Sequence, residues 1–153
     1  MKNPPDGWPR ISSALFYQDA ARAIDWLCRA FGFEVRLKVE GEGGRIEHSE
    51  LEYGGGVIMV GSAGGKSGRP ERAFCVSPRS VGDSNTQSLC VCVDEVDTHC
   101  ARARAGSARI VTEPATQDYG EEYGAHRTYE AVDLEGHHWW FMHQVRAPKP
   151  RAA

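Results

Sequence analysis

Long apolar runs are missing from this 153-residue chain: nowhere do about 18 apolar residues follow one another, so no membrane span is expected. A basic excess is also missing, because 18 Lys and Arg residues stand against 21 Asp and Glu residues. A protein that binds nucleic acid normally carries a basic face, so we expect no nucleic-acid partner. The start of the chain lacks an apolar targeting segment, and we expect a cytoplasmic protein.

A regular cysteine pattern is missing, because the chain has five cysteines, an odd number, at irregular spacings. Cys90 and Cys92 are two positions apart without a second pair, which fits no zinc-binding pattern. Neighbours on one strand rarely reach disulfide geometry, so a redox pair of these two residues is only the alternative. We expect reduced thiols that lie in the core.

Residues 9–63 are expected to form one strand–helix–strand–strand–strand module. After a short strand at 11–17, Asp19 can cap a helix because its carboxylate accepts backbone N–H groups. The apolar residues that follow are spaced as on a helix with one buried face, and Gly32 stands where a left-handed C-cap would stand. Three strands complete the module, at 33–40, 45–53 and 57–60.

Residues 88–145 repeat this order as a second module. A strand at 89–93 precedes a helix that Asp94 or Asp97 can cap. The remaining elements are expected as strands at 109–112, 127–134 and 137–143, with a long loop at 114–124.

The rest of the chain is expected to connect or flank the two modules. Residues 64–87 are rich in Gly, Ser, Pro and Arg and predict a flexible linker, mobile near 64–68. Residues 1–8 and 146–153 are expected to be tails, the second one basic and solvated. Two such modules can face each other and enclose a cleft, because each covers the apolar side of the other.

The closing segment resembles the closing motif of the vicinal oxygen chelate superfamily, which includes glyoxalases, bleomycin resistance proteins and extradiol dioxygenases: residues 123–141 read YGAHRTYEAVDLEGHHWWF. In that family a Tyr-Gly leads into a strand, then an Asp, an acidic-Gly turn and an aromatic strand. The opening segment, residues 15–35, is similar to the family's opening, where an Asp begins the helix and Phe-Gly-Phe ends it. The resemblance implies an α+β fold of paired βαβββ modules forming a U-shaped mixed sheet around a cleft (glyoxalase-like), and a homodimer.

The resemblance places the four metal-ligand positions of the family on residues of other types: Ser12, Met59, Ser88 and Trp140. Hydroxyls, a thioether and an indole are poor ligands for a hard divalent ion, which prefers carboxylate and imidazole. We therefore expect no cofactor in the cleft. The alternative is a divalent metal bound by another set of side chains: His48, Glu50 and His138.

A metal-free cleft would be lined by small and aromatic side chains, which suit a flat or amphipathic organic ligand. The predicted ligand-binding residues are Ser12, Met59, Ser88, Tyr129, His138 and Trp140. Since strand neighbours alternate, we expect Trp140 to face the cleft and Trp139 to pack against the second helix. The acidic and aromatic loop 117–123 can cap the cleft and attract a cationic ligand, or be an ordinary solvated loop.

We predict small-molecule binding, with the ligand sequestered as by the bleomycin-binding members of the family. One alternative is a metal-dependent lyase, isomerase or dioxygenase with unusual ligands. Another is a metal-free enzyme with His138 or another histidine as general base, because the pKa of histidine lies near neutrality. No Ser-His-Asp or Cys-His arrangement is legible in the sequence, and residues alone do not name the ligand.

Overall fold

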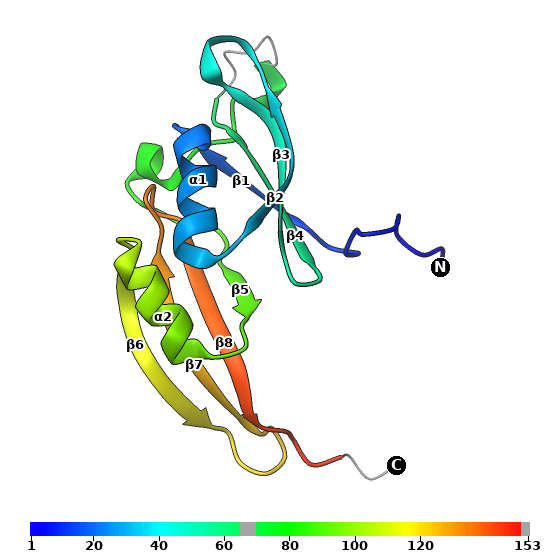
Figure 1. Cartoon of the computed structure of the whole chain (residues 1–153), viewed down its shortest axis with the longest axis vertical. Coiled ribbons are helices and arrows are strands. Elements are labelled where there is room, and N and C mark those ends of the chain that lie inside the picture. Colours follow the sequence, from blue (N-terminus) through cyan, green and yellow to red (C-terminus); the bar gives the residue numbers. More distant parts are fainter. Residues whose placement is uncertain (65–69, 151–153) are drawn as a thin grey trace.

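The computed structural model describes residues 1–64 and 70–150, and it has the predicted α+β fold (Figure 1). In the sheet of the first module, β1 and β4 are parallel and the other neighbours are antiparallel, in the order β1-β4-β3-β2. The elements of this module are β1 (Ser13–Tyr17), α1 (Ala20–Phe31), β2 (Glu34–Glu40), β3 (Ile46–Tyr53) and β4 (Gly56–Ser62).

The second module repeats the order and the strand directions of the first. Its sheet runs β5-β8-β7-β6, with β5 and β8 parallel and the other neighbours antiparallel. Its elements are β5 (Leu89–Cys92), α2 (Val96–Ala105), β6 (Arg109–Asp118), β7 (Ala125–Val132) and β8 (His138–Arg146). The architectural repeat predicted from the sequence is therefore present.

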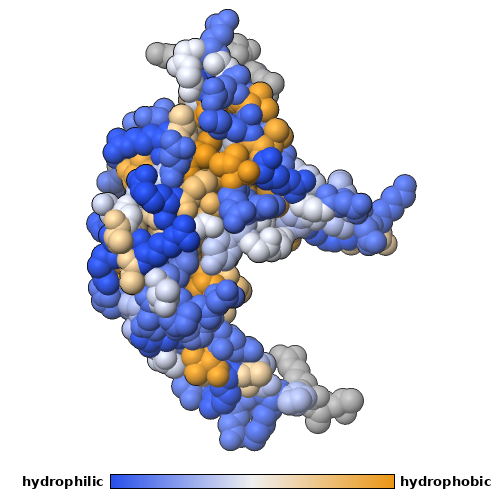
Figure 2. Space-filling model, in the orientation of Figure 1, coloured by the Kyte–Doolittle hydropathy of each residue, from blue (hydrophilic) through white to orange (hydrophobic). Residues whose placement is uncertain are grey.

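Both helices lie on the same side of the molecule. Figure 1 shows α1 beside the first sheet and α2 beside the second, both on the left in this view. The space-filling view shows a crescent whose hollow opens away from the helices (Figure 2). Each sheet thus buries one face under its helix and leaves the other, here called the helix-free face, toward the hollow.

Helix α1 begins and ends where the sequence predicts. The Asp19 carboxylate accepts the N–H of Arg22 at 3.0 Å. Gly32 ends the helix in the left-handed conformation, with φ of 83°, which a residue with a Cβ rarely adopts. The apolar stripe of α1 is buried along its whole length.

The cap of α2 differs from the prediction. Glu95, rather than Asp94 or Asp97, accepts the N–H of Thr98, at 3.1 Å. Asp97 instead forms an ion pair with Arg127 on β7. Three neighbouring acidic residues can each cap a helix, and only the path of the chain after β5 selects among them.

Strand β6 is longer than predicted and runs through Pro114. The sequence predicts a strand only at 109–112, because proline lacks an N–H and rarely sits inside a sheet. However, β6 is an edge strand, and its pairing with β7 is irregular between Thr112 and Ala115. Proline is tolerated at such a bulge, so the predicted loop at 114–124 shrinks to 119–124.

The segment between the modules is partly ordered. In its described part, two short 3-10 turns form at Pro70–Arg72 and Pro78–Val81. The mobility predicted near 64–68 falls on residues 65–68, which lie outside the described ranges. Within residues 1–64 and 70–150, neither helix has the length and apolar character that a membrane crossing needs.

One hydrophobic core joins the two modules. Phe31 at the end of α1 packs edge-on against Trp139 and Phe141 of β8, with ring centroids 5.3 and 4.8 Å apart. Trp139 also meets Phe33, at 5.7 Å. Trp139 is buried as predicted, but the rings it meets come from the first module and from Phe141 rather than from α2.

A buried carboxylate fastens the second module to the start of α1. Glu135, in the turn between β7 and β8, accepts the N–H groups of Gln18 and Asp19 at 2.7 and 2.9 Å and the Ser77 hydroxyl at 2.6 Å. The Glu135 side chain is 2% exposed. The start of a helix has unpaired N–H groups and attracts negative charge, so Glu135 supplies from one module what the other lacks.

Asp133 extends this contact. Its carboxylate accepts the Tyr17 hydroxyl at 2.6 Å, the Trp139 indole N–H at 3.1 Å, and the N–H groups of Glu135 and His137 at 3.0 Å. Burial, and next the Asp133 charge, raise the pKa of Tyr17 well above its ordinary value. Tyr17 therefore stays a neutral donor that ties β1 to the second module.

His99 on α2 makes a third link between the modules. Its Nε2 lies 2.9 Å from the Phe31 carbonyl oxygen and its Nδ1 lies 2.7 Å from the Tyr129 hydroxyl. A carbonyl oxygen only accepts, so Nε2 carries the proton and Nδ1 accepts from Tyr129. Burial lowers the pKa of His99, which keeps the ring neutral.

Replacing Glu135 with Ala should lower the free energy of unfolding by about 3–5 kcal/mol, because three neutral donors in the interior lose their acceptor and each unsatisfied donor costs about 1–3 kcal/mol. Urea unfolding followed by circular dichroism measures the change. The matched control is Glu122→Ala, which removes an exposed loop carboxylate and should stay within about 0.5 kcal/mol of wild type. Equal stability of the two variants would contradict the structural role of Glu135.

The free energy of unfolding should decrease as pH falls below about 6.5, because the unfolded chain takes up a proton that folded His99 resists. Since the pKa of His99 is lowered on folding, its contribution is complete above the unfolded pKa and is lost on acidification. Urea titrations at several pH values measure the slope. The slope should shrink in His99→Gln and persist in His126→Gln; an unchanged slope in His99→Gln would overturn the assignment.

Candidate functional site

The helix-free faces carry the positions that the resemblance assigns to metal ligands. Met59 stands opposite Ala14 across β4 and β1, and Trp140 stands opposite Cys90 across β8 and β5. The two serines lie two residues before these partners and so share their faces. The four positions therefore correspond pairwise between the modules: Ser12 with Ser88, and Met59 with Trp140.

The donor chemistry at these positions does not fit a divalent ion. Across residues 1–64 and 70–150, no three His, Cys, Asp or Glu side chains lie where they could hold one. In the alternative set, His48 and Glu50 meet, with Nε2 and Oε1 3.1 Å apart, but His138 pairs with Glu130 on the other sheet. One chain does not assemble that set, and we assign no reaction step to a metal.

Tyr129 is wrongly predicted as a cleft residue. Its side chain is fully buried, lies 2.7 Å from His99 Nδ1 and stacks on Phe141 at 4.9 Å between ring centroids. It faces the core because it alternates with Glu130, which takes the helix-free face. Burial raises the pKa of Tyr129 far above its ordinary value.

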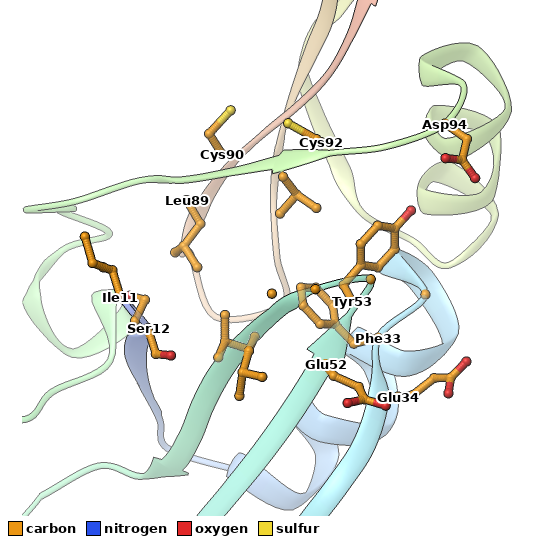
Figure 3. A pocket seen from close by; sticks show the side chains of 18 residues that line it. Ile11, Ser12, Phe33, Glu34, Glu52, Tyr53, Leu89, Cys90, Cys92 and Asp94 are labelled. Atoms are coloured by element: carbon orange, nitrogen blue, oxygen red, sulfur yellow. The ribbon is translucent and has the colours of Figure 1, made fainter. Parts of the chain in front are cut away.

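A cavity of about 890 Å³ lies where the two modules meet (Figure 3). Strand β5 forms one wall, and the end of α1 with the β3–β4 hairpin forms the other. Its apolar lining consists of Ile11, Phe33, Tyr53, Val57, Ile58, Leu89 and Val91. A cavity of this size with an apolar lining and a few polar groups is typical of small-molecule sites.

Three residues with hydroxyl groups belong to the lining of this cavity: Ser12, Ser13 and Tyr53. In the part of the chain that the structure describes, Ser12 Oγ is buried without a hydrogen-bond partner. Such atoms are rare in folded proteins, and a bound ligand can supply the missing bond. Burial, and next the Asp94 charge, raise the pKa of Tyr53, so its hydroxyl is a neutral donor; Figure 3 shows it on the Asp94 side of the cavity.

Three carboxylates line the same cavity. Glu34 and Glu52 stand directly opposite each other on β2 and β3, and Figure 3 shows both at one end of the cavity, with Asp94 across from them. Like charges placed opposite each other destabilise a strand pair. Among the described residues, no Lys or Arg lines the cavity and none of the three carboxylates forms an ion pair.

A second cavity, of about 520 Å³, adjoins the first at Cys90, which lines both. Trp140, Tyr119 and Met142 form its apolar part, and Glu130 adds a fourth carboxylate. Trp140 is 38% exposed and faces the hollow, the orientation expected from the sequence. The residues that line these two cavities are together called the groove below.

Met59 does not line the groove. It belongs to a separate cavity of about 400 Å³, together with Phe16, His48 and Phe74. Of the six residues predicted to bind ligand, the structure therefore brings only Ser12 and Trp140 to the groove.

The thiols of Cys90 and Cys92 are exposed, whereas the sequence predicts core residues. Strand β5 is an edge strand, and both residues take its helix-free face. Cys100 on α2 is buried as expected, and all five cysteines are free thiols.

The predicted cap loop contributes little charge to the groove. Tyr119 lines the second cavity. Asp118 and Glu121 form ion pairs with Arg146 and Lys149 near the C-terminal end. Their charges are thus neutralised within the chain, and the carboxylates that face the groove come from other segments.

Ser88 and His138 meet beside the groove. His138 Nδ1 lies 2.8 Å from Ser88 Oγ, and His138 Nε2 lies 2.7 Å from Glu130 Oε2. The Thr112 hydroxyl donates to the other Glu130 oxygen at 2.8 Å. The sequence alone does not indicate Glu130, because only the pairing of β7 with β8 brings it beside His138. The available signal in the sequence is the spacing of eight residues between Glu130 and His138 across the turn.

Residues 10–141 match the family model described as Glyoxalase/Bleomycin resistance protein/Dioxygenase superfamily. The chain belongs to this superfamily. The resemblance seen in its opening and closing segments is thereby confirmed.

Two proteins are similar to this chain over most of their length. Uncharacterized protein Mb0911c of Mycobacterium bovis is 31% identical, covering 90% of this chain and 85% of that protein. TioX from Micromonospora sp. ML1 is 33% identical, with a TM-score of 0.67, covering 90% of this chain and 99% of that one. The fosfomycin resistance protein FosX of Listeria monocytogenes is 12% identical, with a TM-score of 0.59 over 88% and 91% of the two chains, which supports the fold alone.

Proposed function

We propose that this superfamily member binds and sequesters a small organic cation in the groove. The observation that carries the proposal is the facing pair Glu34 and Glu52, held at an apolar cavity without a basic partner among the described residues. Because the pair costs strand stability, its presence beside the cavity supports a role in attracting positive charge. Asp94 and Glu130 extend the same negative potential along the groove.

The apolar lining defines the rest of the ligand. Phe33 and Tyr53 in the first cavity and Trp140 and Tyr119 in the second offer aromatic faces. Aromatic faces bind flat apolar groups by stacking and cations by cation–π attraction. A flat amine with an apolar body could occupy both cavities if it were long enough to extend past Cys90, where the cavities adjoin. Its polar edge would lie near Ser12.

Sequestration agrees with the kinds of protein found in the superfamily. Its description includes bleomycin resistance proteins, and its fold is shared by a fosfomycin resistance protein. The residues at the four ligand positions favour this function over a metal-dependent lyase, isomerase or dioxygenase. Fold similarity alone would not separate the two.

Thioflavin T, a flat cationic dye, is the probe, and the anionic aromatic dye anilinonaphthalene sulfonate is its counterpart. Thioflavin T should bind with a salt-dependent affinity and quench tryptophan fluorescence, and most of the quenching should vanish in Trp140→Phe. Changing Glu34 and Glu52 together to Gln should weaken binding about tenfold, or about 1.4 kcal/mol, by calorimetry.

The matched control changes Glu42 and Glu122 together to Gln, which removes the same charge from exposed sites outside the groove. Its affinity for thioflavin T should equal that of wild type. Equal binding of both dyes, or equal losses in both double variants, would refute charge-directed binding. A stoichiometric divalent ion in the purified protein would favour the metal-dependent alternative.

We also propose that the protein is a homodimer. Val35, Leu37 and Val39 on the edge strand β2 are each 42–47% exposed. Figure 2 shows apolar surface gathered over this module. An exposed apolar edge strand tends to pair with another chain, and a second copy with the same edge closes the contact by twofold symmetry.

Light scattering after size exclusion should give the mass of two chains for wild type and of one chain for Leu37→Lys. The control is Val111→Lys, because Val111 is 49% exposed on the other edge strand, β6. This variant should stay dimeric. A monomeric wild type, or a dimer unaffected by Leu37→Lys, would rule out pairing through β2.

A further inference from the structure

Beside the groove, three polar side chains form one chain of hydrogen bonds: Ser88, His138 and Glu130. We propose that this relay makes Ser88 a nucleophile that takes an acyl group from an activated carboxylic ester and passes it to water. The activity goes beyond ligand binding, and it does not require the organic cation proposed for the groove.

The direction of the relay follows from the donors and acceptors. An ionised Glu130 carboxylate only accepts, so the proton of a neutral His138 lies on Nε2. Nδ1 then carries the lone pair, 2.8 Å from Ser88 Oγ, and the Ser88 hydroxyl donates to it. A nucleophile, a base and a carboxylate that orients the base have the roles of a catalytic triad, which is recognised by geometry rather than by sequence order.

The base is held in position, whereas the nucleophile is accessible. The His138 and Glu130 side chains are only 19% and 17% exposed, and Ser88 is exposed. The Trp140 ring packs edge-on against His138 at 5.5 Å, and Thr112 fixes Glu130 through its second oxygen. Because Ser88 is exposed, solvent can satisfy its hydroxyl without the hydrogen bond to His138.

The proposed reaction balances without a cofactor. Ser88 Oγ attacks the ester carbonyl carbon, and its proton passes to His138 Nδ1 while Glu130 stabilises the imidazolium. The bond to the alcohol oxygen breaks, and that oxygen takes the proton from Nδ1. Water then attacks the acyl-Ser88 ester by the same route, which releases the acid and restores Ser88.

The strand that follows Ser88 can supply a donor for the oxyanion. Strand β5 is at the edge of its sheet, and alternate N–H groups of an edge strand point away from the sheet. Backbone N–H groups near a nucleophile stabilise the negative oxygen that forms during acyl transfer.

The test treats the full chain with a fluorophosphonate, which forms an Oγ–P bond on activated serines and releases fluoride. Peptide mass spectrometry should locate the adduct on Ser88, and Ser88→Ala should abolish it. Glu130→Gln and His138→Gln should slow labelling at least about tenfold, because charge or base is lost. The control Ser84→Ala, at an exposed serine on the same segment, should label like wild type.

Turnover is measured with p-nitrophenyl acetate in a Cys90→Ala, Cys92→Ala background, since the exposed thiols also react with esters. Hydrolysis should disappear in Ser88→Ala. Ser88 is exposed, so this substitution leaves the fold intact, and the variant tests the proposal even if Glu130→Gln unfolds. Labelling of Ser88 no faster than of Ser84, labelling unchanged in a folded Glu130→Gln, or labelling without ester turnover would each overturn the proposal. Ser88→Ala should still bind thioflavin T, so the experiment distinguishes a failure of the proposed esterase activity from a failure of the proposed ligand binding.

Discussion

The buried Glu135 carboxylate sets the relation between the two modules on which the rest of the molecule depends. It accepts the N–H groups of Gln18 and Asp19 at the start of α1, although it belongs to the last turn of the second module. A charge in an apolar interior is tolerated only with strong partners, and Glu135 finds them only where the second module docks on the start of α1. The aromatic core around Phe31 then packs against a fixed partner.

This docking places both helices on one side and leaves both helix-free faces to the hollow. The core side of each sheet is apolar and closed, with Trp139, Tyr129 and Phe141 fully buried. The helix-free side carries the groups that are costly to a fold, among them the facing Glu34 and Glu52 and the exposed thiols of β5. Groups that weaken folding without another evident use commonly mark a functional surface.

Membership in the superfamily explains the backbone arrangement around the site but not the side chains that line it. By the resemblance, the ligand positions of the family fall on Ser12, Met59, Ser88 and Trp140, and Met59 and Trp140 stand at corresponding register positions of the two modules. These four side chains are poor ligands for a hard divalent ion. Around these positions the chain has built two other arrangements, an acidic groove and a serine–histidine–glutamate relay. A shared fold accommodates such changes because sheet positions fix where a side chain points, not what it is.

The sequence by itself determined the elements and their order, because the helix stripe ending at Gly32 and the alternation around Trp140 are local patterns that survive folding. It did not determine which of three acidic residues caps α2, that β6 passes through Pro114, or that Tyr129 faces the core, since each depends on neighbouring strands. The candidate site was predicted only in part: Ser12 and Trp140 could be named from the sequence, whereas the roles of Glu34, Glu52 and Glu130 depend on the strand register. The spacing of neighbouring residues can be read from the sequence, whereas contacts between distant residues form only when the two modules dock.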